Sequence, residues 1–373
     1  MARLAEEKKP LTESRTFEAS RRIAQEARHR ITQVASRIPR ASAFLKFKTD
    51  FGPAERIVVV SDTHLGFPVE EIMERRMVEV LCDELSGMGQ IDELILLGDV
   101  FDFWQATVEE ALERGRDMMT ALFTMDNIRR MIYIPGNHDH HAFQLYHDEE
   151  KSHRLRKGSI DPPELSVPMT NDCPIMEALR PSGARVPLYM AYPLHQVIVQ
   201  GKQVLLTHGQ MLGFFERSIW SPKNSMVRAL FLGKEKSLSL EDMERFVAPY
   251  YEMLTLSAAV PGVLEGRYRV YRWISASARI LGVTGESRES LYRDTTIEEN
   301  AAEVEALLDH FCEETPDYFV FGHTHLPGRM TLPVSGVEAI NTGCWLPGAA
   351  AVEAPSTMLE ISDEARFIQV DIK

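Results

Sequence analysis

The stretch Ile57-Val58-Val59-Val60-Ser61-Asp62-Thr63-His64 joins a short apolar run directly to a polar cluster. Four consecutive β-branched residues favour a strand that is covered on both faces, because no alternate position is polar. The change at Asp62, Thr63 and His64 marks the end of that strand. The sequence therefore predicts a buried strand whose carboxyl end presents acidic and imidazole side chains.

The same combination of an apolar run and a polar cluster recurs along the chain. Helical stretches separate the runs, which is typical of a layered α/β protein. Two later runs, at residues 337–341 and 366–372, predict that sheet structure continues to residue 372 and allow a second sheet. Further strands are expected at Leu94-Ile95-Leu96-Leu97, Met131-Ile132-Tyr133-Ile134, Val204-Leu205-Leu206-Thr207 and Tyr318-Phe319-Val320-Phe321.

A polar cluster follows each of the five strands. Ligands of open α/β sheets bind at the carboxyl ends of the strands, so the five clusters can converge on one place. In extended chain residues i and i+2 point the same way, so Asp-x-His and His-x-His pairs can face one site. The glycines are expected to permit tight turns beside a bound ion or phosphate. The clusters are Asp62-Thr63-His64, Gly98-Asp99 with Asp102, Gly136-Asn137-His138-Asp139, Thr207-His208-Gly209 and Gly322-His323-Thr324-His325.

The side chains in these clusters are carboxylates, an amide and imidazoles, without a thiolate. Such ligands suit manganese, iron or zinc better than Ca²⁺ or Cu(I). Each fragment alone is weak evidence for a metal site, because Asp-x-His usually lies in a solvated loop and Gly-Asp is common in turns. All five in this order, each after a strand, predict a metal site.

The five clusters together resemble the motifs of the calcineurin-like metallophosphoesterases, D-x-H, G-D-x-x-D, G-N-H-D, H and G-H-x-H, all of which are present. The resemblance covers about residues 56–352. It implies a four-layer α/β/β/α sandwich. It also implies a hydrolase that cleaves phosphoester or pyrophosphate bonds with a bridging water or hydroxide on two divalent ions, manganese, iron or zinc.

The resemblance also assigns the site residues. His138 is then the histidine that does not bind metal, and it could stabilise transition-state charge or protonate the leaving oxygen. The implied ligands are Asp62, His64 and His325 on one ion, Asn137, His208 and His323 on the other, and Asp99 between both.

Two segments, Ser61 to Gly66 and Gly98 to Trp104, resemble the UDP-2,3-diacylglucosamine hydrolases. The chain departs from those enzymes at Asn137-His138, where they generally have Asn-Arg. The expected substrate is a small phosphodiester, with a nucleotide-sugar lipid as one candidate. Two alternatives are a DNA repair-type nuclease and a metal-free scaffold of the same fold. The acidic charge argues against duplex nucleic acid, and the intact ligand set argues against the scaffold.

Three parts are expected along the chain: an N-terminal helical extension at 1–52, a core at 53–210 and 316–373, and a helical insertion at 211–315 over the active site. The apolar side chains of the insertion, among them Phe214 and Phe215, are expected either to pack helix on helix or, beside Arg217 and Arg228, to receive an amphiphilic phosphate. Residues 151–193 lack a clear period and are expected to form a loop.

Four aromatic side chains near the clusters have two possible roles each. Trp104 is expected either to pack in the fold or to stack on a substrate. His140, His141 and His147 are expected either to lie at the surface or to contact a substrate.

The charge is unevenly distributed. The net charge is −14, yet residues 1–50 carry 12 Lys/Arg and 6 Asp/Glu, so the rest contributes about −20. Residues 16–47 read as a basic amphipathic helix that packs on the body or a second subunit, or contacts a membrane surface.

The four cysteines form no C-x-x-C pair, and no apolar run reaches the roughly 18 residues of a spanning helix. A cytoplasmic enzyme, with peripheral membrane contact as one option and oligomeric state open, is expected.

Overall fold

The computed structural model of the chain describes residues 51–215, 239–260, 295–345 and 356–370, apart from positions 70, 162 and 166, together with a few isolated residues. The predicted helix at 16–47 and the cations Arg217 and Arg228 lie outside these ranges. None of the helices in the described part of the chain has the length and apolarity needed to cross a membrane.

The larger sheet has seven strands in the order β12-β11-β1-β2-β3-β5-β4. Strands β1, β2, β3 and β5 run parallel, while β11, β12 and β4 are antiparallel to their neighbours. The parallel run is buried throughout β1, β2 and β3, as expected for strands covered on both faces. The strands are β1 (Ile57–Val60), β2 (Glu93–Leu96), β3 (Met131–Tyr133), β4 (Val167–Thr170), β5 (Leu188–Tyr192), β11 (Ser356–Ile361) and β12 (Ala365–Val370).

The smaller sheet has five strands in the order β6-β7-β8-β10-β9. Strands β7, β8 and β10 are parallel, so their carboxyl ends share one edge. The strands are β6 (Leu194–Val199), β7 (Lys202–Thr207), β8 (Tyr318–Phe321), β9 (Gly328–Thr331) and β10 (Glu338–Asn341).

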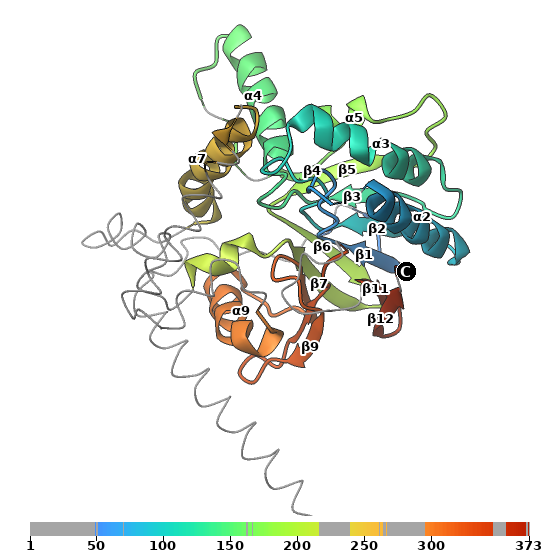
Figure 1. The fold of residues 1–373 in the computed structure, drawn as a ribbon. Coiled ribbons are helices and arrows are strands. Elements are labelled where there is room, and N and C mark those ends of the chain that lie inside the picture. Colours follow the sequence, from blue (N-terminus) through green and yellow to red (C-terminus); the bar gives the residue numbers. More distant parts are fainter. Residues whose placement is uncertain are drawn as a thin grey trace, which may run out of the picture.

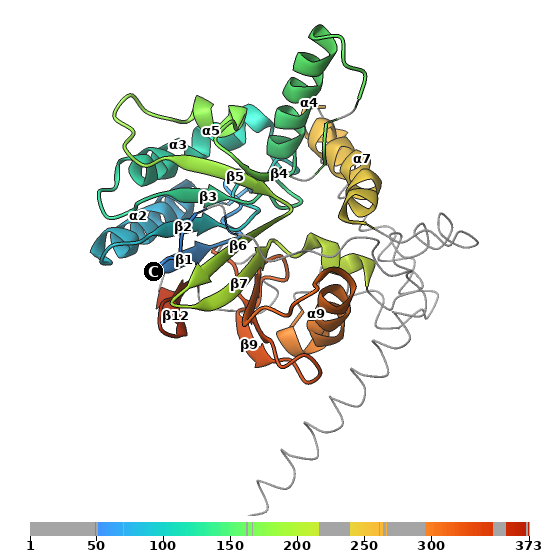
Figure 2. The same ribbon diagram turned by 180° about the vertical axis from the view of Figure 1, so that it is seen from behind.

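The two sheets pack face to face with helices on both outer sides (Figures 1 and 2). One core lies between the sheets and includes Val59 and Val320. A second core joins the larger sheet to helices α2 (Glu71–Gly87), α3 (Val108–Thr124) and α5 (Pro174–Ala178). A third joins the smaller sheet to η1 (Gln210–Phe214), α7 (Leu240–Ala258) and α9 (Ile297–Phe311). The expected four-layer α/β/β/α fold is therefore present.

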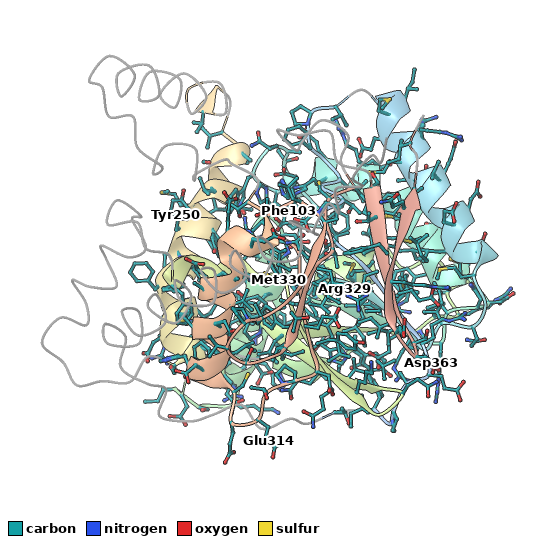
Figure 3. The ribbon with its side chains drawn as sticks, turned by 90° about the horizontal axis from the view of Figure 1, so that it is seen from below. Phe103, Tyr250, Glu314, Arg329, Met330 and Asp363 are labelled. Atoms are coloured by element: carbon teal, nitrogen blue, oxygen red, sulfur yellow. The ribbon has the colours of Figure 1, made fainter. Side chains whose placement is uncertain are left out.

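Three helices begin with a complete capping box. Thr107, Ser239 and Thr296 each accept a hydrogen bond from a backbone N–H in the first turn of α3, α7 and α9. An acidic side chain three residues later bonds back to the cap, so the sequence itself fixes where these helices start. In the view of Figure 3, α7 with Tyr250 and the β11–β12 turn at Asp363 lie at opposite sides of the molecule.

The seven strands predicted from sequence are present. The expectation of a loop at 151–193 is wrong, because this stretch contains the end of α4 (His141–Arg156), α5 and the strands β4 and β5. Strand β5 lies between Pro187 and Pro193, and its pairing with β3 and β4 gives it the strand structure that its local sequence did not reveal.

The region predicted as a helical insertion contains two well-described helices. Helix α9 contacts β9 and β10 and forms the outer layer of the smaller sheet. Phe214 and Phe215 are buried in the same core, so for these two side chains the packing alternative holds and the expectation that they meet a substrate is wrong. Helix α7 stands beside α4 at the carboxyl edge of the larger sheet (Figure 1). The predicted domain boundaries remain predictions.

Candidate metal centre

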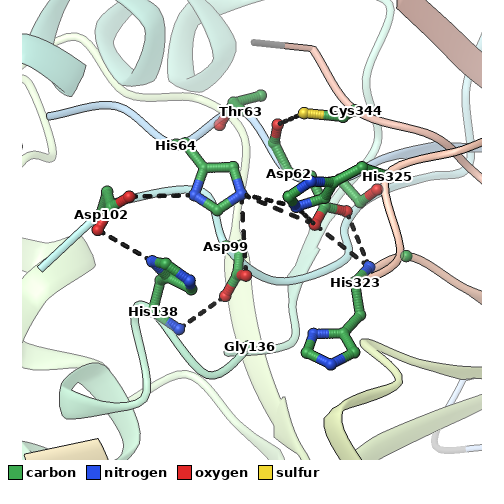
Figure 4. A network of polar contacts seen from close by, with 12 residues as sticks. Asp62, Thr63, His64, Asp99, Asp102, Gly136, His138, His323, His325 and Cys344 are labelled. Carbon is green, nitrogen blue, oxygen red and sulfur yellow. Dashed lines mark hydrogen bonds and ion pairs between the residues drawn. The ribbon is translucent and has the colours of Figure 1, made fainter. Parts of the chain in front are cut away.

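The five polar clusters meet where the parallel strands of both sheets end. Asp62 and His64 follow β1, Asp99 follows β2, and Asn137 and His138 follow β3. From the smaller sheet, His208 follows β7, while His323 and His325 follow β8. Figure 4 shows most of these side chains from close by, facing one another.

Two groups of donor atoms are close enough to hold cations. In the first, His64 Nε2 lies 3.3 Å from His325 Nε2, and Asp62 Oδ1 lies 3.9 Å and 3.5 Å from these two atoms. In the second, donor atoms of Asp99, His208 and His323 all lie within 4.8 Å of one another.

The carboxylate of Asp99 reaches both groups. Its Oδ2 is 3.1 Å from His208 Nε2 and 3.9 Å from His64 Nε2. The side chain of Asn137 is buried, and its Oδ1 accepts no hydrogen bond in the described part of the chain. A buried amide oxygen without a donor is costly, so an electropositive partner such as a cation suits this position.

Hydrogen bonds behind the histidines orient their rings. His208 Nδ1 donates to the carbonyl of Leu97 at 2.9 Å, which leaves Nε2 facing Asp99. His64 Nδ1 faces Asp102 at 3.3 Å, and its Nε2 faces the other donors. Carboxylate or carbonyl partners on the outer ring nitrogen are usual for metal-binding histidines, because they fix tautomer and orientation. The arrangement fits a metal centre.

The carboxylates draw positive charge into the centre. Burial lowers the pKa of His208, but Asp99 and Asp62 outweigh burial and raise it to about 10. Burial raises the pKa of Asp99, yet His208 and His138 bring it well below its usual value. A metal ion at this place would supply the positive charge that the carboxylates favour, and it would displace protons from the imidazoles.

The backbone is strained at the centre. Among described non-glycine residues only six have positive φ, and five of them are predicted ligands: Asp62, His64, Asp99, His323 and His325, with φ between 46° and 66°. Left-handed conformations cost energy for residues with a Cβ and concentrate at functional sites. The fold therefore holds these predicted ligand residues in conformations that they rarely adopt.

Glycines give the ligand side chains room. A Cβ on Gly136 would stand 2.3 Å from Asp99 Oδ1, and one on Gly322 would stand 2.3 Å from Asp62 Oδ2. Gly98 has φ +81°, and a Cβ there would lie 2.4 Å from the His208 ring. The glycines were expected to leave room for an ion or phosphate. The structure shows that the atoms nearest to them belong to the side chains of predicted ligands.

Replacing Gly322 with alanine is expected to lower metal content and activity while the protein stays folded, because the new methyl group must push the Asp62 carboxylate aside. Ion content per chain and thermal melting check this. Gly183→Ala is the matched control, because Gly183 has nothing within 4 Å of an added Cβ. Equal metal content in both variants would contradict the role given to Gly322.

Two further acidic residues shape the centre without a role foreseen from sequence. The Asp139 carboxylate accepts hydrogen bonds from the N–H groups of Gly136 at 2.6 Å, Val100 at 2.8 Å and Asp99 at 3.2 Å. It therefore fastens the turn after β3 to the turn after β2. Asp102 contacts both His64 and His138. Asp102 is the last residue of the G-D-x-x-D motif and Asp139 the last residue of G-N-H-D, and these positions were the only sequence features that could have indicated their roles.

His138 lies at the rim of the centre, with its ring fixed on several sides. Its Nδ1 donates to Asp102 Oδ1 at 2.9 Å, and its backbone N–H donates to Asp99 Oδ1 at 2.8 Å. Trp104 stacks on the ring at 4.0 Å between centroids, so Trp104 packs on His138. Burial lowers the pKa of His138, but Asp102 and Asp99 outweigh this and raise it to about 9.

A cysteine also reaches the first group of donors. Cys344 Sγ lies within 4.8 Å of donor atoms of His64 and His325, and its thiol donates to the carbonyl of Asp62 at 3.3 Å. This contact could not be predicted from the sequence, because Cys344 follows β10 and belongs to none of the five clusters. His140, expected at the surface or in contact with substrate, is instead fully buried.

The family of the chain follows from comparison with models of known protein families. The calcineurin-like phosphoesterase family model matches residues 55–327, a range that contains all five clusters. Comparison with curated proteins finds no match.

Similar solved structures include three from different organisms. A dimetal phosphatase from Danio rerio is 15% identical, with 86% of this chain and 100% of that chain covered and a TM-score of 0.35. A metallophosphoesterase from Sphaerobacter thermophilus is 13% identical, with coverage of 86% and 89% and a TM-score of 0.33. A Vps29 single mutant from Entamoeba histolytica is 11% identical, with coverage of 85% and 99% and a TM-score of 0.32.

Proposed function

Since the chain belongs to the calcineurin-like phosphoesterases and is a metal-dependent hydrolase of phosphoester bonds, we propose that its centre holds two divalent cations and acts on a small phosphorylated compound. The observation that carries the dinuclear centre is the position of Asp99, whose Oδ2 lies 3.1 Å from His208 and 3.9 Å from His64. One carboxylate within reach of two donor groups can be shared by two ions.

The proposed ligands divide between the two donor groups. Divalent cations bound there lower the pKa of water and neutralise charge on the phosphoryl oxygens. The absence of a thiolate from the proposed set favours manganese, iron or zinc. Asp62, His64 and His325 would hold one ion, Asn137, His208 and His323 would hold the other, and Asp99 would be shared by both.

His138 is the proposed catalytic residue. With Nδ1 bonded to Asp102, Nε2 is the ring nitrogen that we propose faces the substrate. A proton on Nε2 could be given to the leaving oxygen, or could stabilise charge in the transition state. The contact with Asp102 keeps the ring in the orientation that this requires.

The proposed substrate is a small phosphodiester or pyrophosphate, and a nucleotide-sugar lipid is one member of that class. The support is the net charge of −14, which repels polyanionic nucleic acid, and the segments that resemble UDP-2,3-diacylglucosamine hydrolases. The purified protein with Mn²⁺ should be tested on an aryl phosphomonoester, an aryl phosphodiester, UDP-diacylglucosamine and single-stranded DNA. Efficient cleavage of DNA with no activity on the small compounds would favour a nuclease.

Removing divalent cations should abolish hydrolysis. Dialysis against a chelator is expected to lower activity to background, and adding Mn²⁺, Fe²⁺ or Zn²⁺ back should restore it with about two ions per chain. Metal analysis and initial rates on the aryl esters check this together. Full activity in a protein that retains no ion, or saturation at one ion, would contradict the dinuclear centre.

A further inference from the structure

A buried chain of hydrogen bonds ties α7 to the segment that follows Asn137 and His138. His140 is fully buried, with its Nε2 2.6 Å from Glu244 Oε1 and its Nδ1 3.0 Å from Glu252 Oε1. The Tyr192 hydroxyl donates to the second oxygen of Glu244 at 2.6 Å, and His141 Nδ1 contacts the second oxygen of Glu252 at 2.6 Å. These five residues, His140, His141, Tyr192, Glu244 and Glu252, are called the clasp below.

The clasp is an ionic contact. An ionised carboxylate only accepts hydrogen bonds, and both ring nitrogens of His140 lie against carboxylate oxygens, an arrangement that suits a doubly protonated imidazole. Burial lowers the pKa of His140, but Glu244 and Glu252 outweigh it and raise the pKa to about 9. Burial raises the pKa of Glu252, but His140 and His141 bring it down to about 2. Removing one partner would leave a buried charge uncompensated, so a broken clasp is expected to loosen α7.

The same helix supports the ring of His138. Tyr251, which is buried between Glu244 and Glu252 along α7, has its ring centroid 5.4 Å from that of His140 and 5.8 Å from that of Trp104. Trp104 stacks on His138 at 4.0 Å. The rings therefore form a continuous packed path from α7 to the proposed catalytic histidine.

Helix α7 also packs against the outer layer of the smaller sheet. Met243 and Val247 are buried in the core that covers the smaller sheet, together with Phe214 and Phe311. The helix thus bridges the outer layer of one sheet and the strand ends of the other.

We propose that His140 is a positioning residue, which with Glu244 and Glu252 holds α7 so that Tyr251 and Trp104 keep the ring of His138 aligned with the leaving oxygen. The inference rests on the proposed role of His138 as the acid. No residue of the clasp belongs to the proposed ligand set, so loss of the clasp should spare the cations.

The test uses the dependence of the rate on the leaving group. Protonation matters little for p-nitrophenolate, which leaves readily, and much more for phenolate. Glu252→Gln, His140→Gln and Tyr251→Leu are each measured in the full-length protein loaded with Mn²⁺. The substrates are the p-nitrophenyl and phenyl esters of the same phosphate, as monoesters or diesters according to which the parent protein hydrolyses.

The expected result is unchanged metal content, with kcat on the phenyl ester falling about 10-fold more than kcat on the p-nitrophenyl ester. The matched controls are on the same helix: Glu241→Gln, at a half-exposed carboxylate, and Tyr250→Leu, the same change at an exposed neighbouring ring. Both controls should behave like the parent protein. His140→Gln still donates to one carboxylate, and it carries the test of the clasp should Glu252→Gln fail to fold.

Equal losses on the two esters would show that the clasp is merely structural and would overturn the inference, as would variants that match the parent on both. Loss of cations in the clasp variants would overturn it too. If the parent protein hydrolyses none of the small phosphorylated compounds of the substrate panel, the proposed function fails and the inference with it. If the parent and His138→Ala behave as proposed while the clasp variants do not, only the inference fails.

Discussion

Asp99→Ala is expected to lose at least one cation per chain and nearly all activity. Its carboxylate lies between the two donor groups, and its removal would leave two cations facing each other with less compensating charge. Loss of an outer-sphere partner alone typically costs about 10- to 100-fold, so loss of a shared ligand should exceed this range. Metal analysis and initial rates on an aryl ester measure both effects.

Two variants make the Asp99 result specific. Asp99→Asn keeps the shape and the acceptor for the backbone N–H of His138, so it separates loss of charge from loss of packing. Asp117→Ala removes an exposed carboxylate from α3 and should change neither metal content nor rate. An Asp99→Ala protein with two ions per chain and the parent's rate would refute the shared-ligand assignment.

His138→Ala is expected to keep both cations while kcat falls by about 10²-fold or more, which is typical for a positioned general acid. The ring is held by Asp102 at 2.9 Å and by the stacked Trp104, so its place is fixed before substrate binds. The fall should be larger for a phenyl than for a p-nitrophenyl ester. Metal content and kcat on both esters, measured on one preparation, check the prediction.

The competing possibility is that His138 binds metal, since its donor atom lies within 4.8 Å of those of His64 and Asp99. Release of a cation from His138→Ala would support that role and remove the residue from acid catalysis. His153→Ala is the matched control, because His153 is an exposed histidine in the last turn of α4.

The sequence predicted the strands that carry the centre because their signal is local. Strands β1, β2, β3 and β8 are buried along their whole length, so each has a continuous apolar run that ends at its polar cluster. Strand β5 was missed because its neighbourhood is rich in proline and polar residues and its structure depends on pairing with β3 and β4. The local sequence therefore predicts a strand that is buried along its length better than a strand whose structure depends on pairing with distant segments.

The sequence by itself determined the chemistry of the candidate centre: the types of donor, their order and their attachment to strand ends. Only the tertiary structure decided how each donor is held. It set the left-handed backbone of five predicted ligand residues, and it placed Trp104 on His138.

The structure also places His140, expected as a surface or substrate-contacting histidine, in the interior between two carboxylates, which lie 104 and 112 positions further along the chain. A local pattern can report which side chains a strand end presents. Whether a buried charge is tolerated depends on partners that only the folded chain brings within hydrogen-bond distance.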